Sequence, residues 1–322
     1  MRTSLVFLVF LAAACSPDTG GPPPPPPPPA HVYVANFGSS TITSFSINDT
    51  GNATPALTIS GPSTTLDSPE GVVVDPAGVL ITTSANPWRI VVFAANAAGD
   101  VGPVATIVGA NTRLSHPTGL TLDQSARLYV ANSASDSIVI FAPGANGNVA
   151  PFGVLGGSNT LLASPAGMAM DIRGRLYVAN KANNVITVFA AGATGNARPV
   201  DTIAGPNTGL NAPLGIAIDP GGRLYVANSG TSAATSSITV YASGASGNVA
   251  PIRTIAGSTT GLDQPQGIAL DGGQRIWAAS SAFASHLYRI TVYPGNADGN
   301  VAPVVTLSGN NTGLTVPSHI AF

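Results

Sequence analysis

From residue 31 onward, the sequence repeats one unit six times. The clearest marker is the segment RLYVAN with its variants, which begins at residues 31, 79, 127, 175, 223 and 275, a spacing of 48 residues that lengthens once to 52. Two prolines keep the same step: the first lies 13 residues after the isoleucine of each SITVF-like segment, and the second follows 14 residues later. Such a fixed period over six copies indicates an array of equivalent structural units.

Each unit contains four short apolar runs. In the third unit they lie at residues 119–123, 127–132, 137–142 and 151–156, and their alternation and β-branched content predict strands. The linking segments carry turn residues, as at 143–148. Four strands per unit of this length indicate a propeller blade, whereas a β-solenoid, the main alternative, uses shorter repeats. We therefore expect an all-β chain that forms a six-bladed β-propeller with four antiparallel strands per blade.

The two ends of the repeat region complement each other. The region enters at an RLYVAN-type strand without the PxGIAxD-like strand that precedes it elsewhere, and it finishes with that missing strand at 317–322. We expect the ring to be closed by this C-terminal strand joining the N-terminal blade, because an unpaired strand edge invites aggregation. The glycine of each PxG segment would lie on the innermost strand, where backbones crowd the axis, and His319 takes its place in the last strand.

The N-terminal part has the character of an export signal followed by a spacer. Residues 1–14 combine a positive charge, an apolar run too short to span a bilayer, and three alanines before Cys15. This resembles the lipobox of bacterial lipoproteins, which implies lipidation of Cys15. Residues 15–30 include eight consecutive prolines, which favour an extended polyproline II linker. Because the residue after the cysteine is Ser16 and not aspartate, the resemblance implies an exported protein held at the bacterial outer membrane.

The composition limits the possible functions. Only 8% of residues are charged and the formal net charge is −2, so we expect no contact with nucleic acid. Apolar residues make up 44% of the chain, enough for a sizeable core. The sequence shows no nucleophile elbow, phosphate-binding loop or Cys/His metal cluster. We therefore predict no catalytic residues and no cofactor, and we expect a monomer that touches the membrane only through its lipid.

The segments PxGIAxDxxGRLYVAN and SITVF resemble the NHL-repeat propellers over residues 31–322. The resemblance implies the six-bladed fold, but it says little about activity because one fold hosts many functions. The main hypothesis is a non-enzymatic module of the cell envelope that binds a protein, peptide or glycan.

Two loops depart from the repeat. The connections between the second and third strands are four residues longer in the fifth and sixth units, at 229–237 and 281–289. Repeat proteins usually place individual sites where the repetition breaks. The second loop carries aromatic and charged side chains, and we predict a binding rim formed by Phe283, His286, Tyr288 and Arg289.

The alternative hypothesis concerns the mouth of the central channel. Glu70, the only glutamate in the chain, is expected there. The six-bladed senescence-marker and gluconolactonase family binds a divalent metal in its channel through Glu, Asn and Asp, and Glu70 with Asn132, Asn180 and Asn228 resembles that set. The resemblance implies a metal-dependent lactonase-like hydrolase with Ca²⁺ or another divalent cation, for which oxygen ligands are suited. No aspartate falls at a matching channel position, which departs from the family.

Two further sets of polar residues read as parts of the scaffold. An aspartate ends the first strand of five units and precedes a turn, where we expect it to bind the turn backbone: Asp75, Asp123, Asp171, Asp219 and Asp271. His116, which precedes Pro117 in a loop, is expected on the surface.

Overall fold

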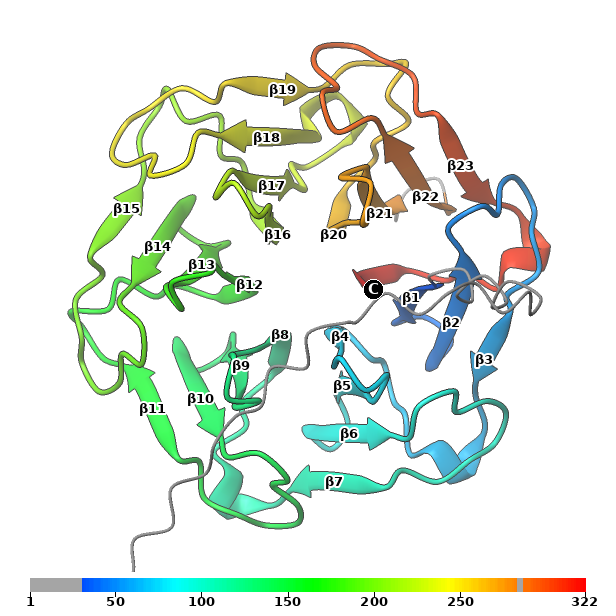
Figure 1. Cartoon of the computed structure of the whole chain (residues 1–322), viewed down its shortest axis with the longest axis vertical. Coiled ribbons are helices and arrows are strands. Elements are labelled where there is room, and N and C mark those ends of the chain that lie inside the picture. Colours follow the sequence, from blue (N-terminus) through cyan, green and yellow to red (C-terminus); the bar gives the residue numbers. More distant parts are fainter. Residues whose placement is uncertain (1–30, 283–285) are drawn as a thin grey trace, which may run out of the picture.

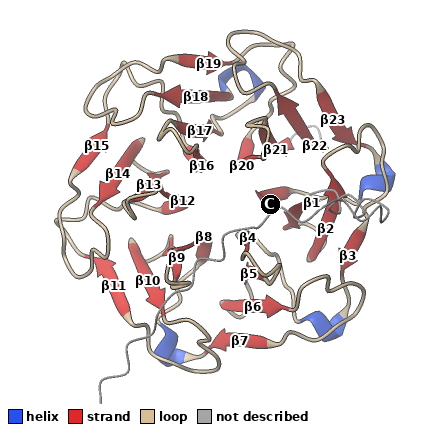
Figure 2. Ribbon diagram, in the orientation of Figure 1, coloured by secondary structure: helices blue, strands red, loops and turns tan. Residues whose placement is uncertain are grey.

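The computed structural model describes residues 31–282 and 286–322, which form six four-stranded antiparallel sheets arranged in a ring (Figure 1). This confirms the predicted six-bladed β-propeller. The predicted signal peptide at 1–14, Cys15, the linker at 15–30 and Phe283 lie outside the described residues. Within the described part, strands account for nearly all regular structure and the helices are four single 3₁₀ turns (Figure 2). No helix there is long and apolar enough to cross a membrane.

The strands run from the axis outward in each blade. Blade 1 contains β24 (Pro317–Ala321), β1 (His31–Asn36), β2 (Thr41–Ser46) and β3 (Leu57–Ile59). Blade 2 contains β4 (Val72–Val74), β5 (Leu80–Ser84), β6 (Arg89–Phe93) and β7 (Ala105–Val108). Blade 3 contains β8 (Pro117–Leu122), β9 (Leu128–Asn132), β10 (Ser137–Phe141) and β11 (Gly153–Gly156).

The other three blades follow the same order. Blade 4 contains β12 (Pro165–Met170), β13 (Leu176–Asn180), β14 (Val185–Phe189) and β15 (Asp201–Ile203). Blade 5 contains β16 (Pro213–Ile218), β17 (Leu224–Asn228), β18 (Ser237–Tyr241) and β19 (Arg253–Ile255). Blade 6 contains β20 (Pro265–Leu270), β21 (Ile276–Ala282), β22 (Leu287–Tyr293) and β23 (Val305–Ser308). The 3₁₀ turns are η1 (Pro62–Thr64), η2 (Ala110–Thr112), η3 (Ala233–Thr235) and η4 (Asn310–Thr312).

Both ends of the repeat region meet in blade 1. The last strand, β24, runs antiparallel to β1, with Ile320 opposite Val34 and Ala321 opposite Tyr33. Figure 1 shows the C-terminus near the axis beside β1. The interface between blades 6 and 1 also carries the outer bridge found at the other five interfaces, here between Gly51 and Leu307. The outer contact between blades 6 and 1 is therefore of the same kind as the contacts between the other neighbouring blades.

The core is divided among the six interfaces between neighbouring blades. Each interface holds one cluster of buried apolar side chains; that of blades 6 and 1, for example, contains Trp277, Phe45 and Ile320. The RLYVAN strands are buried along their whole length because both faces of a blade pack against neighbours. This explains why they read as continuous apolar runs rather than as strict alternation.

A side-chain oxygen in the turn before the fourth strand links each blade to its neighbour by a hydrogen bond. Asn148 Oδ1, for example, accepts a hydrogen bond from the backbone N–H of Asn111 at 2.8 Å. The equivalent residues make the same bond at 2.7–2.9 Å: Asn52, Asp100, Asn196, Asn248 and Asn300. The GN of each GNVAP-like segment is therefore a link between blades as well as a turn.

The recurrent aspartates bind turn backbones, as the sequence predicts. Asp271 Oδ1 accepts the backbone N–H groups of Gly273 and Arg275, both at 2.9 Å. The structure adds a contact that sequence reasoning missed, because the arginine of RLYVAN donates Nε to the second carboxylate oxygen at 2.6–2.7 Å in four blades. Burial alone would raise the pKa of Asp271, but hydrogen bonds from Trp277 and Arg275 outweigh burial and lower it.

Candidate functional site

The innermost glycines close the ring tightly at the axis. A Cβ at Gly167 would lie 2.3 Å from the carbonyl oxygen of Leu214 in the next blade, and the equivalent distances at the other four glycines are 2.1–2.8 Å. The predicted crowding is therefore confirmed. His319 takes this position in β24, and its ring lies by the backbone of Glu70. The residue as a whole is half-buried, but both ring nitrogens are closed off from solvent and have no hydrogen-bond partner. Their burial lowers the pKa of His319 to about 4, because it outweighs the nearby Glu70 backbone, which acts in the opposite direction but makes no hydrogen bond of normal geometry to the ring.

The three asparagines predicted as metal ligands hold the loops between blades. Asn132, Asn180 and Asn228 are fully buried. Each Oδ1 accepts a backbone N–H from the segment before the first strand of its own blade, at 3.0–3.1 Å. Each Nδ2 donates a hydrogen bond of 2.8–3.0 Å. The acceptors for Asn132, Asn180 and Asn228 are, in this order, Arg113 O, Thr187 Oγ1 and Thr239 Oγ1. The side chains thus have partners within their own blades, and the metal site stays a prediction.

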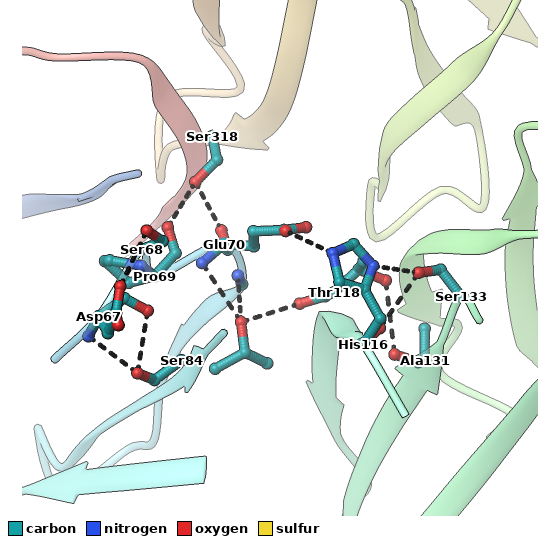
Figure 3. A network of polar contacts seen from close by, with 12 residues as sticks. Asp67, Ser68, Pro69, Glu70, Ser84, His116, Thr118, Ala131, Ser133 and Ser318 are labelled. Carbon is teal, nitrogen blue, oxygen red and sulfur yellow. Dashed lines mark hydrogen bonds and ion pairs between the residues drawn. The ribbon is translucent and has the colours of Figure 1, made fainter. Parts of the chain in front are cut away.

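Glu70 directly precedes the innermost glycine Gly71 of blade 2, and its carboxylate faces blade 3 (Figure 3). We call the surroundings of this carboxylate the mouth, after the position expected for it. Glu70 Oε1 is 3.3 Å from His116 Nε2. The other ring nitrogen of His116, Nδ1, is 2.5 Å from Ser133 Oγ. Figure 3 shows these side chains in a row across the gap between blades 2 and 3. The structure therefore brings together a carboxylate, an imidazole and a hydroxyl that are far apart in the sequence.

Several backbone contacts fix this row. The backbone N–H groups of Glu70 and Gly71 donate to Thr83 Oγ1 at 3.3 and 2.7 Å, and Ser318 Oγ donates to the Glu70 carbonyl at 2.8 Å (Figure 3). On the other side, the backbone N–H of Ser133 donates to the His116 carbonyl at 3.1 Å. Backbone hydrogen bonds therefore hold the segments that carry Glu70, His116 and Ser133 in place.

Three ionisable side chains, those of Glu70, His116 and Lys181, determine the charge around the Glu70 carboxylate. Burial raises the pKa of Glu70, and the neighbouring charges of His116 and Lys181 act in the opposite direction. Lys181 is the only lysine in the chain and is exposed. The side chain of His116 is 44% exposed and that of Glu70 21%, so solutes can reach the imidazole. The carboxylate and the imidazole are thus in contact, and the ammonium group of Lys181 acts on the same carboxylate through its charge.

Sequence reasoning missed His116, Ser133 and Lys181 as a group. His116 was expected on the surface, which its exposure bears out, but its neighbours were not foreseen. Its position, just before the inner proline, has a left-handed backbone in all six blades, with φ of 47–51°. A comparison of the six units at this position shows the available signal: Ser68, His116, Ser164, Ala212, Gln264 and Val316. Only one of these side chains is an imidazole.

The predicted rim differs in form from the expected loop. The extra residues of blade 6 lengthen the hairpin of β21 and β22, with Ser280 opposite Arg289 and Ala282 opposite Leu287. In blade 5, the extra residues contain η3. Strand pairing continues because the extended hairpin is still covered: β21 is buried along its whole length, and Tyr288 of β22 packs partly against the core between blades 6 and 1. The loop prediction was therefore wrong in its secondary structure for residues 281–282 and 287–289, which are strand.

Two surface depressions flank the extended hairpin, each with a volume of about 570 Å³. The first is lined by His286, Leu287 and residues of the connection from β23 to β24. The second is lined by Ala233, Ala234 and residues of the connection from β19 to β20. Arg289 belongs to both. The connections predicted to share one face thus do so here.

Comparisons with known proteins agree on the fold only. No protein-family model and no curated protein matches the sequence. A protein of unknown function from Bacteroides caccae superposes with a TM-score of 0.66 at 10% identity, over 91% of this chain and 98% of that one. A chain of a nidogen/laminin complex gives 0.61 at 16%, over 90% and 97%. A proposed 6-phosphogluconolactonase from Bacteroides uniformis gives 0.57 at 15%, over 87% and 83%.

Proposed function

We propose that this chain is an NHL-like binding propeller of the bacterial envelope, exported and anchored through a lipid on Cys15, whose rim binds a protein or peptide without chemical conversion. The observation that carries the proposal is the position of Arg289 between two depressions. One of the similar structures, a chain in a nidogen/laminin complex, is a propeller-like chain found with a protein partner.

Arg289 is suited to bind an acidic group. Within the described part of the chain, no carboxylate forms an ion pair with it. Its guanidinium lies beside Gly261. A side chain at this position would place its Cβ 3.6 Å from Nη1, so the glycine leaves more room for a partner to reach the guanidinium. A guanidinium binds carboxylates through two parallel hydrogen bonds. The neighbouring Leu287 is 56% exposed and offers apolar contact. A partner segment with an acidic residue next to apolar ones fits this surface.

The test is selection from a random peptide library on the purified propeller. We expect enriched peptides to carry Asp or Glu beside apolar residues and to lose at least about tenfold in affinity for Arg289→Ala, the size of loss typical of an interface anchor. The matched control is Arg89→Ala, because Arg89 holds the equivalent position in blade 2 and, like Arg289, donates Nε to the carbonyl two residues before it, but it lines neither depression. Equal binding by wild type and Arg289→Ala would contradict the proposal, and so would enrichment of glycans but no peptides on a parallel array.

The anchoring part of the proposal has its own test. Wild-type chain expressed in a Gram-negative host should appear in the outer-membrane fraction and incorporate labelled fatty acid. The Cys15→Ser chain should do neither, because the thiol that accepts the lipid is gone. Retention of the variant in the membrane fraction would contradict lipid anchoring.

The metal-dependent hydrolase stays an alternative, supported by the carboxylate of Glu70 at the mouth and by likeness to a proposed 6-phosphogluconolactonase. It requires about one divalent metal per chain, bound through oxygen ligands. Elemental analysis of protein equilibrated with Ca²⁺ measures this directly, with Glu70→Ala as the variant that should lose the metal. A metal-free wild type would exclude the alternative.

A further inference from the structure

The row formed by Glu70, His116 and Ser133 has the order of a nucleophilic site. Glu70 Oε1 approaches His116 Nε2 to 3.3 Å as a charge contact rather than a hydrogen bond, and a carboxylate this close to one imidazole nitrogen favours the tautomer with the proton on that nitrogen. Neutral His116 with its proton on Nε2, toward Glu70, leaves Nδ1 as an acceptor facing Ser133 Oγ at 2.5 Å. The hydroxyl can also reach the His116 carbonyl, but at the longer distance of 3.1 Å. Carboxylate, imidazole and hydroxyl are thus linked in the way that activates a serine, with the two ring nitrogens exchanged relative to the common arrangement.

The repeat shows that this arrangement is local to blade 3. The residue after the second-strand asparagine or serine is also serine in blades 5 and 6, at Ser229 and Ser281. There, the position of His116 is taken by Ala212 and Gln264, and both serines are buried. Ser133 is only half-buried, and His116 is 44% exposed along its side chain. Of blades 3, 5 and 6, only blade 3 therefore has an accessible serine next to an imidazole.

Asn132 positions the imidazole. Its Oδ1 accepts from the backbone N–H of Ser115 at 3.1 Å, and its Nδ2 donates to the Arg113 carbonyl at 2.8 Å. These bonds fix the segment that leads into His116. Asn132 is thus a positioning residue for the row.

We propose that Ser133 is a nucleophile that takes acyl groups from carboxylic esters or lactones, with His116 as general base and Glu70 orienting His116. Ser133 Oγ attacks the carbonyl carbon while its proton passes to His116 Nδ1. The C–O bond to the leaving alcohol then breaks, and the alcohol takes that proton. Water attacks the acyl-Ser133 ester, again giving its proton to His116, and Ser133 leaves with it. Lys181 directly follows β13 of blade 4, as Ser133 directly follows β9 of blade 3, and its positive charge favours substrates with a second, anionic group. This activity goes beyond the proposed binding at the rim.

The test uses a fluorophosphonate, which needs no knowledge of the substrate. Attack by Ser133 Oγ forms a P–O bond and expels fluoride, and intact-mass spectrometry reads the adduct. We expect one adduct per chain, on the peptide containing Ser133, formed at the same rate with and without EDTA. Ser133→Ala should abolish it, and His116→Gln should slow it about 100-fold, the lower end of the contribution of a general base. Ser135→Ala is the matched control, because Ser135 is an exposed serine of the same turn whose Oγ contacts Ser137 instead of an imidazole.

A loss of labelling in a variant is informative only if the variant folds. Thermal unfolding must show that His116→Gln folds, and this is expected because its side chain is 44% exposed. Labelling that persists in Ser133→Ala, that is equally fast in His116→Gln, or that does not occur in the wild type would overturn the proposal.

The charge preference is tested with two activated esters, p-nitrophenyl acetate and the mono-p-nitrophenyl ester of succinate. We expect kcat/KM to be higher for the succinate ester, and Lys181→Met to reduce that preference about fivefold, within the range of a single partly screened charge. An unchanged ratio in Lys181→Met would refute the role of Lys181. Loss of labelling leaves the rim proposal intact, because Arg289 does not belong to the row.

Discussion

Replacing His319 by glycine tests the interior of the ring through pH. His319 stands where the other five innermost strands have glycine, so His319→Gly copies the repeat. Both ring nitrogens are buried without a partner, and the pKa falls from the ordinary 6.5 to about 4. The native state therefore excludes the proton that the unfolded chain accepts. Above pH 6.5 both states are neutral and the residue has no effect on the pH dependence of stability; as pH falls from there to about 4, stability is lost at about 1.4 kcal/mol per pH unit, or roughly 3 kcal/mol in total.

Urea unfolding of both proteins at about pH 7 and about pH 4 measures this loss. We expect the wild type to lose roughly 3 kcal/mol more than His319→Gly between the two conditions. Glu70 and the turn aspartates titrate in both proteins, so their contributions cancel in the difference between the two losses. Any packing change caused by the glycine is present at both pH values and cancels too. Equal losses in the two proteins would refute the assignment of a buried, neutral imidazole at this position.

Three further outcomes follow from the packing and the turns. Asp271→Ala should cost about 3 kcal/mol in urea unfolding, because it strips partners from Trp277 Nε1 and Arg275. Asp75→Ala should cost about 1 kcal/mol, since the hydrogen bonds of its carboxylate come from backbone N–H groups; equal costs would contradict the role of the side-chain donors Trp277 and Arg275. Because the pKa of Asp271 is lowered, its stabilisation is present above pH 3.8 and is lost as pH falls through the lowered pKa, so the gap between wild type and Asp271→Ala should narrow in a pH titration of stability. Gly167→Ala should destabilise by about 2 kcal/mol through its clash with the next blade, whereas Gly272→Ala, with open space around it, should stay within about 0.5 kcal/mol; similar melting shifts for the two would contradict the crowded axis.

The fold could be predicted from the sequence because each unit repeats the same demands. Strand patterns, turn residues and inner glycines recur at fixed spacing, and each of the six copies is evidence for the others. The incomplete first and last units also predicted the pairing of β24 with β1. The sequence did not predict the additional hydrogen-bond partners of residues that recur among the units, such as the strand-end asparagines. Asn132 was predicted as a candidate oxygen ligand, and the structure shows it buried, with its side chain holding the loop before Pro117.

The row at the mouth escaped prediction for a different reason. Glu70 and His116 come from neighbouring blades, and Ser133 lies one hairpin further along the chain, so their contact depends on the stagger between blades. No short motif encodes that stagger. A position-by-position comparison of the units would still have marked Glu70, His116 and Lys181, because glutamate, histidine and lysine each occur once in columns otherwise held by uncharged residues. It would not have marked Ser133, because serine recurs in its column at Ser229 and Ser281. The rim could be located from the longer connections, but their length alone does not separate an extended hairpin from a loop.

The placement of every mouth residue depends on β24 completing blade 1 beside β4. Amide hydrogen exchange read by mass spectrometry on the C-terminal peptide of the full chain tests this most directly. If β24 pairs with β1, the amides of Ile320 and its neighbours should exchange at least about 100-fold more slowly than in the same peptide free in solution. Exchange as fast as in the free peptide would show that the last strand does not close the ring.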